Sequence, residues 1–130
     1  MLVHDGVRPF VSQRLIRVCI EEAARYGAAI AALPAFETVK EVEDGASVKR
    51  TLARQNIYLA QTPQVFRREI LEEAFRKAEE ENVLGTDEAS LVERLGLTVR
   101  VVQGDRWNIK ITTQEDLALG RFYLQTMKKA

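Results

Sequence analysis

Cationic and hydroxyl side chains recur in this sequence at the expected ends of strands and in the loops that follow them. They are Arg8, Thr38, Arg54, Thr62, Thr86 and Lys110. In open α/β sheets ligands bind outside the carboxyl ends of the strands, so residues there are site candidates before core residues are. Guanidinium, ammonium and hydroxyl groups that converge from separate loops favour binding of a sugar phosphate. For any one surface cation, the alternative is a solvated charge without a ligand.

Asp5 directly follows the apolar pair Leu2 and Val3. A carboxylate at such a strand end can hold a divalent cation, or sugar hydroxyls beside a phosphate. The alternative is an Asx-turn, in which the carboxylate accepts backbone N–H groups before Gly6. His4 has no second histidine and no cysteine at ligand spacing, so we expect it to be structural.

Other kinds of chemistry lack their usual residues. The seven glycines are never spaced closely enough to surround a triphosphate with backbone N–H groups, and neither a nucleophile elbow nor a metal-ligand pair at helical spacing is present. The 19 basic and 19 acidic residues cancel, so we expect neither a nucleic-acid nor a membrane partner. A single cysteine, Cys19, cannot form an intramolecular disulfide, which favours a cytoplasmic protein. The chain opens in what resembles a strand, and we expect a preceding segment to have been removed.

Alternating strands and helices predict one α/β layered domain over residues 1–130, with a mostly parallel sheet. Strands are expected at 2–3, 28–33, 56–61, 99–102 and 109–111, with Thr62-Pro63-Gln64 as a strand break. Helices are expected from the Ser12 cap to Tyr26, at 67–81 with Phe75 inward, from a Thr86 cap to Gly96, and after a Thr113 cap with Leu117, Phe122 and Leu124 packed.

Residues 38–54 form a polar, β-leaning stretch centred on the turn dipeptide Asp44-Gly45. The stretch is too polar for a pair of central strands and too regular for a linker. We therefore predict a projecting hairpin arm that packs on another subunit. The alternative is an exposed hairpin without a partner.

Several segments together resemble one family, the 2-C-methyl-D-erythritol 4-phosphate cytidylyltransferases of the non-mevalonate isoprenoid pathway. The segments are Val3 to Phe10, Gln61 to Phe66, Thr86 to Ser90, Gly104 to Thr112 and Glu115 to Leu117. They cover the latter part of a family member, somewhat over half. The resemblance implies a Rossmann-like layered nucleotidyltransferase fold without the N-terminal glycine-rich loop that holds CTP. These 130 residues are therefore expected to have no turnover by themselves.

The reaction implied by the resemblance joins CTP and methylerythritol phosphate, with Mg²⁺, to give 4-diphosphocytidyl-methylerythritol and pyrophosphate. The resemblance places Asp5 near the metal and the substrate hydroxyls, and Gly6 and Lys110 beside the nucleotide. Contacts to methylerythritol phosphate are implied for Asp5, Arg8, Thr38, Arg54, Thr62, Thr86, Asp105 and Lys110. Arg54 and Lys110 are implied as the catalytic pair that orients the attacking phosphate. The arm is implied to exchange across a homodimer, so that Thr38 and Arg54 serve the neighbouring site.

One position departs from the pattern: some members place an aspartate directly before Asn-Ile-Lys, where this chain has Trp107, and Asp105 is its nearest substitute. Two other functions stay open from the sequence. One is a dimerising scaffold without chemistry of its own. The other is a cytidylyltransferase acting on ribitol 5-phosphate.

Overall fold

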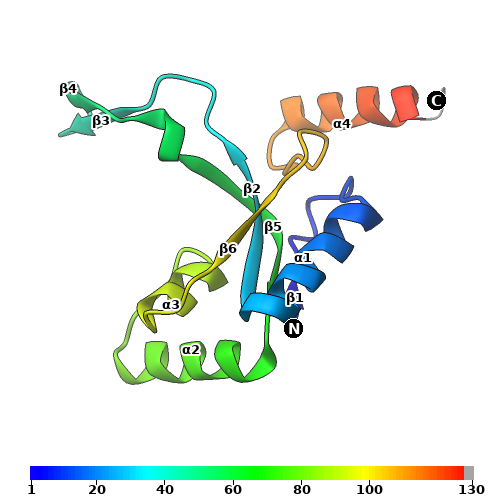
Figure 1. The fold of residues 1–130 in the computed structure, drawn as a ribbon. Helices are drawn as coiled ribbons and strands as arrows, with labels where there is room; N and C mark the ends of the chain where they lie inside the picture. The colour runs from blue at the N-terminus through cyan, green and yellow to red at the C-terminus, as the bar shows by residue number, and fades with distance from the viewer. Residues whose placement is uncertain (128–130) are drawn as a thin grey trace.

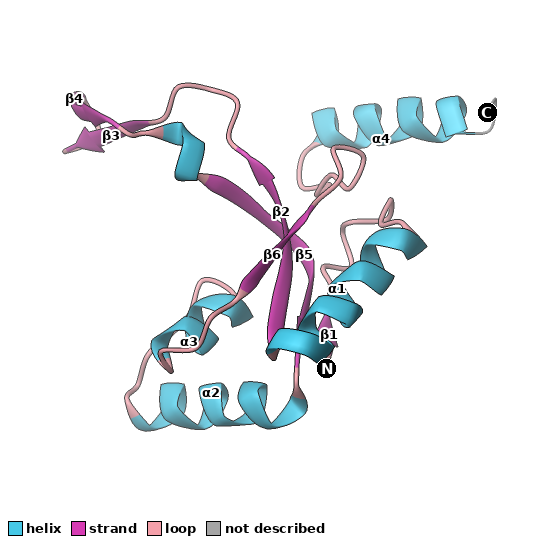
Figure 2. Ribbon diagram, in the orientation of Figure 1, coloured by secondary structure: helices cyan, strands magenta, loops and turns pink. Residues whose placement is uncertain are grey.

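The computed structural model describes residues 1–127, so the last three residues of the predicted domain lie outside the described part. A four-stranded sheet forms its centre (Figures 1 and 2). Its strands pair in the order β1-β5-β2-β6. The strands are β1 (Leu2–Val3), β5 (Tyr58–Phe66), β2 (Ala28–Pro34) and β6 (Arg100–Gln103). Within residues 1–127 no helix is both long and apolar enough to span a bilayer.

The sheet is mixed, and the prediction of a mostly parallel sheet is wrong at the level of strand pairs. β2 and β6 pair in parallel, whereas β5 is antiparallel to both β1 and β2. Parallel neighbours need a crossover connection, but β2 returns to β5 through the arm without a covering helix. The strands β1, β2 and β6 still share one direction, so the segments that follow β1 and β6 leave the sheet at the same end.

Helices cover both faces of the sheet and form three layers. Helix α1 (Gln13–Tyr26) packs on Ala29 and Ala31, whereas α2 (Arg68–Glu80) and α3 (Glu88–Arg94) pack on Ala28 and Ile30. Successive side chains of a strand point to opposite faces, so the unbroken apolar run in β2 serves both cores. This layered α/β architecture confirms the predicted fold class.

Local signals set the ends of α1 as predicted. The Ser12 hydroxyl accepts the Leu15 N–H (3.1 Å), and Gly27 ends the helix with φ of 96°, a conformation that residues with a Cβ rarely adopt. The cap predicted for α3 is wrong by one residue. Asp87, not Thr86, accepts the Ser90 N–H (2.9 Å), and the Ser90 side chain completes a capping box.

The predicted strand break at Thr62-Pro63-Gln64 is also wrong, because β5 continues through it to Phe66. The pairing of β5 with β2 changes register between Ile30 and Ala32, next to Pro63. A proline has no N–H for the ladder and is tolerated where the register is irregular.

The arm is an antiparallel hairpin of β3 (Lys40–Glu43) and β4 (Ser47–Thr51), as predicted. Asp44 (φ 52°) and Gly45 (φ 74°) form its turn. A short 3-10 helix, Arg54–Asn56, returns the chain to β5. Figure 1 shows the arm extending away from the three layers, and every residue of β4 is exposed.

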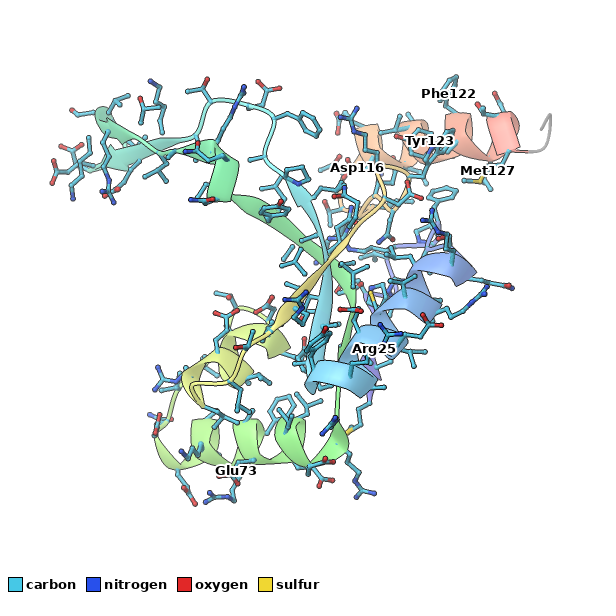
Figure 3. The ribbon with its side chains drawn as sticks, viewed as in Figure 1. Arg25, Glu73, Asp116, Phe122, Tyr123 and Met127 are labelled. Carbon is cyan, nitrogen blue, oxygen red and sulfur yellow. The ribbon has the colours of Figure 1, made fainter. Side chains whose placement is uncertain are left out.

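The last helix, α4 (Gln114–Met127), begins after Thr113, whose hydroxyl accepts the Asp116 N–H as predicted. Its predicted packing residues are wrong, because Leu117, Phe122 and Leu124 are all exposed in this chain. The helix packs on the loops instead, through buried Gly120 and through Tyr123 (Figure 3), whose ring contacts those of Phe10 and Trp107. The predicted strand at 109–111 does not form, because the backbone bonds of this segment, from Ile109 N–H to Trp107 O and from Ile111 N–H to Val7 O, do not make a ladder.

Candidate functional site

A cleft of about 860 Å³ lies along β5, bounded by the β1–α1 loop, by α2 and α3, and by Lys110. The predicted site residues that line it are Asp5, Arg8, Thr62, Thr86 and Lys110. Asp5 and Lys110 meet there because the segments after β1 and β6 leave the same end of the sheet.

Asp5 lies between two cations at the polar end of the cleft. Its Oδ2 accepts the Arg8 Nε (3.2 Å) and pairs with the Lys110 Nζ (3.2 Å). Burial raises the pKa of Asp5, but the hydrogen bonds and charges of Lys110 and Arg8 outweigh it, so the pKa lies below its ordinary value. The carboxylate is therefore ionised at neutral pH.

Arg8 is the best-held of these cations, with a side chain that is 11% exposed. Besides the bond to Asp5, its Nη1 donates to the backbone oxygen of Asn108 (2.7 Å). By contrast, the Lys110 side chain is 48% exposed, so its ammonium retains donors for a ligand. The site therefore combines a fixed guanidinium with an accessible ammonium.

His4 and Thr62 hold the start of this loop. The Thr62 hydroxyl accepts the Asp5 N–H (3.0 Å) and bonds to the His4 Nδ1 (2.8 Å), while the His4 Nε2 bonds to the Arg8 carbonyl (3.0 Å). Since a carbonyl can only accept, a neutral His4 ring carries its proton on Nε2 in this arrangement. His4 thus has the structural role expected of it. The Asx-turn alternative for Asp5 is not seen, because the carboxylate faces Arg8 and Lys110.

At the other end of the cleft, exposed Thr86 directly precedes the α3 cap. Gln64 is 2% exposed, and its amide donates to the Asp87 carboxylate (2.8 Å) and accepts the Ala89 N–H (3.1 Å). This amide joins β5 to the start of α3 and so sets the position of Thr86. Phe75, predicted to be buried, is 50% exposed and lines this end of the cleft, because α2 turns it toward the opening.

Four predicted site residues lie outside the cleft. Thr38 and Arg54 belong to the arm, where the Arg54 guanidinium donates to the Phe36 carbonyl. Gly6 is exposed in the turn beside Asp5. The Asp105 carboxylate accepts the Trp107 N–H (2.9 Å) within its own loop and does not line the cleft, so nothing supports a substrate contact for it in this chain.

Beside Arg8 and Lys110, the carboxylate that a metal ion could bind is that of Asp5, whereas Glu79, Asp87 and Glu88 line the part of the cleft next to α2 and α3. Among residues 1–127, no group of three or more histidine, cysteine or acidic side chains is arranged to hold a metal. Mg²⁺ commonly takes one or two protein carboxylates and completes its octahedron with substrate phosphates and water. The contacts found for the Asp5 carboxylate are all to Oδ2, so Oδ1 fits such a role together with a phosphorylated ligand.

Sequence reasoning gave no role to three buried amides beside the cleft: Gln61, Gln64 and Asn108. Gln61 and Gln64 flank the more obvious Thr62 and Pro63; Gln61 was predicted to end a strand, and Gln64 to lie in the break after it. A buried strand that carries two glutamines is a signal in itself, since buried polar side chains require partners.

The fold and the site define a class: an α/β layered domain whose strand-end cleft presents cations and hydroxyls suited to a phosphorylated small molecule. Comparison with known proteins narrows the class. The family model described as 2-C-methyl-D-erythritol 4-phosphate cytidylyltransferase matches residues 1–126. The chain therefore belongs to the 2-C-methyl-D-erythritol 4-phosphate cytidylyltransferase family.

Individual relatives agree with this membership. The chain is 53% identical to the protein of that name from Syntrophus aciditrophicus, over 96% of this chain and 53% of the relative. It is 49% identical to the one from Bacillus cereus, over 99% of this chain and 57% of the relative. The crystal structure of the Thermus thermophilus protein superimposes with a TM-score of 0.87 at 38% identity, over 95% of this chain and 61% of that one. The chain thus spans about half the length of the curated relatives it matches.

Proposed function

We propose that this chain supplies the polyol-phosphate-binding part of an enzyme that transfers CMP from CTP to 2-C-methyl-D-erythritol 4-phosphate. The products are 4-diphosphocytidyl-2-C-methyl-D-erythritol and pyrophosphate. One observation carries the proposal: Asp5, Arg8, Thr62, Thr86 and Lys110 line a single cleft in a chain that matches the family over residues 1–126.

The proposed chemistry needs no protein nucleophile. A phosphate oxygen of methylerythritol phosphate attacks the α-phosphorus of CTP, the bond from that phosphorus to the bridging oxygen breaks, and pyrophosphate leaves. Catalysis of such a transfer consists mainly of positioning and of cations that neutralise the charge on the transferring group. In this proposal Lys110 holds the attacking phosphate, and Asp5 and Thr62 hold the polyol hydroxyls.

The arm supports a second part of the proposal, a homodimer in which Arg54 and Thr38 complete the neighbouring site. Both residues lie outside the cleft of their own chain, and the apolar Val42 and Val48 are exposed on the arm. A second copy that covers the arm would bury these side chains and bring Arg54 to the partner's Lys110.

Mg²⁺ is the cofactor we propose for the reaction, with Asp5 as its protein ligand. The ion would neutralise the phosphate charges of CTP. Asp5 Oδ2 is engaged by Arg8 and Lys110, which leaves Oδ1 as the oxygen for the metal. The 130 residues are expected to bind methylerythritol phosphate without turnover, because their seven glycines are not clustered as in a loop that surrounds a triphosphate with backbone N–H groups.

The test is a comparison of substrates and variants in the natural protein that contains this chain. Release of pyrophosphate from CTP and Mg²⁺ is measured with methylerythritol phosphate and with ribitol 5-phosphate. Turnover of the first and its loss in Lys110→Ala are expected. Preference for ribitol 5-phosphate would contradict the assigned substrate. Unchanged turnover in Lys110→Ala and Arg54→Ala would indicate a scaffold.

A further inference from the structure

Lys110 reaches the cleft from a segment that is neither helix nor strand. The residue that follows Lys110 is Ile111, whose N–H donates to the Val7 carbonyl (2.9 Å). Two residues before Lys110 lies Asn108, which is fully buried. The distance of 3.2 Å between Lys110 Nζ and Asp5 Oδ2 therefore depends on how the loop 104–108 is held against the sheet.

The side chain of Gln61 holds this loop as a neighbouring strand would. Its Nε2 donates to the Asp105 carbonyl (3.0 Å), and its Oε1 accepts the Asp105 N–H (3.2 Å). Gln61 is 8% exposed, and buried backbone groups without a partner are costly. A side chain that lacks the acceptor would leave the Asp105 N–H unpaired, and one that lacks the donor would leave the Asp105 carbonyl with the Asn108 N–H alone (3.0 Å).

Asn108 interlocks with Gln61 and extends the network to Arg8. Its Nδ2 donates to the Thr62 carbonyl (2.7 Å) and lies 3.4 Å from the Gln61 Oε1. Its backbone oxygen accepts the Arg8 Nη1 (2.7 Å). The two amides thus fix Lys110 through the loop and Arg8 through a direct bond.

Two further features show that Gly104 and Asn108 are the residue types that the network requires. A Cβ on Gly104 would lie 2.4 Å from the Gln61 Oε1 and 3.1 Å from the backbone oxygen of Ala32, so only glycine leaves room for the amide. The Asn108 Oδ1 is buried and has no hydrogen-bond partner within residues 1–127. An apolar side chain would avoid this cost, so the NH₂ group of Asn108 is what the position requires.

We propose that Gln61 and Asn108 are positioning residues, which set the Lys110 ammonium and the Arg8 guanidinium at the polar end of the cleft. They act through these two cations, since the amide of Gln61 is engaged with the loop and Asn108 does not line the cleft. The identity of the ligand as a polyol phosphate rests on the proposed function. The positioning role needs only an anion that the two cations bind.

A double-mutant cycle tests the proposal, with the dissociation constant for inorganic phosphate as its readout. Gln61→Leu, Asn108→Ala and Lys110→Ala are each expected to weaken phosphate binding about tenfold, and the loss caused by Gln61→Leu should be smaller in the Lys110→Ala background, where only its effect through Arg8 remains. Cys19→Ser, a buried substitution on the opposite face, should leave phosphate binding unchanged. Gln61→Glu, which keeps the shape and removes the donor, replaces Gln61→Leu if that variant does not fold.

Additive losses, or equal losses in Cys19→Ser, would overturn the proposal, because a general loss of stability would then explain them. Absence of phosphate binding by the unsubstituted protein would also overturn it. In the natural protein that contains this chain, the same cycle is repeated on kcat and KM with methylerythritol phosphate and CTP. Failed turnover together with an intact phosphate cycle would refute the proposed function and leave the positioning role standing.

Discussion

Replacing Arg8 with alanine should destabilise this protein far more than replacing an arginine whose ion pair is shorter. Arg8 bonds to Asp5 at 3.2 Å and to the Asn108 carbonyl at 2.7 Å. Arg68 bonds to Glu72 at 2.6 Å. Distance alone would rank Arg68 first, so the comparison separates the effect of distance from that of burial.

Burial decides the expected magnitudes. The Arg8 side chain is 11% exposed, whereas those of Arg68 and Glu72 are 76% and 56% exposed. Each hydrogen bond to a charged group is worth about 1.5–3 kcal/mol. Lys110 still pairs with Asp5 after the substitution, so the total loss for Arg8→Ala should stay near about 2–4 kcal/mol, below the full sum. The solvated pair of Arg68 should contribute nothing measurable.

Urea unfolding followed by far-UV circular dichroism measures both variants under the same conditions. The midpoint for Arg8→Ala should fall clearly, with an unchanged slope, and the midpoint for Arg68→Ala should stay in place. A loss below about 0.5 kcal/mol for Arg8→Ala, the size of an ordinary surface effect, would refute the reasoning. So would equal losses in the two variants.

Three further predictions concern pH, the arm and the buried thiol. The pKa of Asp5 in the folded protein lies below its ordinary value of 3.8, so its ion pairs should stabilise the fold fully above about pH 4. This stabilisation should be lost as the pH falls through the lowered folded pKa. The difference in unfolding free energy between the unsubstituted protein and Asp5→Asn should therefore shrink on acidification, and a constant difference would contradict this. In the natural protein that contains this chain, Arg54→Ala and Lys110→Ala subunits, each inactive alone, should regain about a quarter of full activity when refolded together, since half the dimers are mixed and each mixed dimer holds one intact site of two. No recovery would show that the arm serves its own chain. Burial raises the pKa of Cys19 to about 11, so iodoacetamide should not label the folded protein at neutral pH, and mass spectrometry showing rapid labelling would place the thiol at the surface.

The elements of the fold could be predicted wherever the deciding signal is local in the sequence. Helix α1 is the clearest case, since Ser12 and Gly27 bound an apolar repeat of helical period. The direction of β5, and its passage through Pro63, depend on pairing with strands far away in the sequence. The packing face of α4 was equally hidden, because apolar residues lie all around that helix and buried Gly120 marks the contact side.

The site divides in the same way. Arg8, Thr62 and Lys110 could be named from the resemblance and from their places after strands, and they line one cleft. Gln61 and Asn108 could not be named, because an amide becomes informative only when the backbone groups that it pairs are known. Asp105 was misplaced for a related reason: its carboxylate is already used by the turn of its own loop.

The central claim is that Arg8 and Lys110, brought to one cleft from opposite ends of the sequence, bind the phosphate of methylerythritol phosphate. Isothermal titration of methylerythritol phosphate into the unsubstituted protein, Arg8→Ala, Lys110→Ala and the exposed-arginine control Arg68→Ala measures it directly. Binding at least tenfold weaker in the first two variants, about 1.4 kcal/mol, and unchanged in the third is the expected result. Equal affinity across all four proteins would contradict the account.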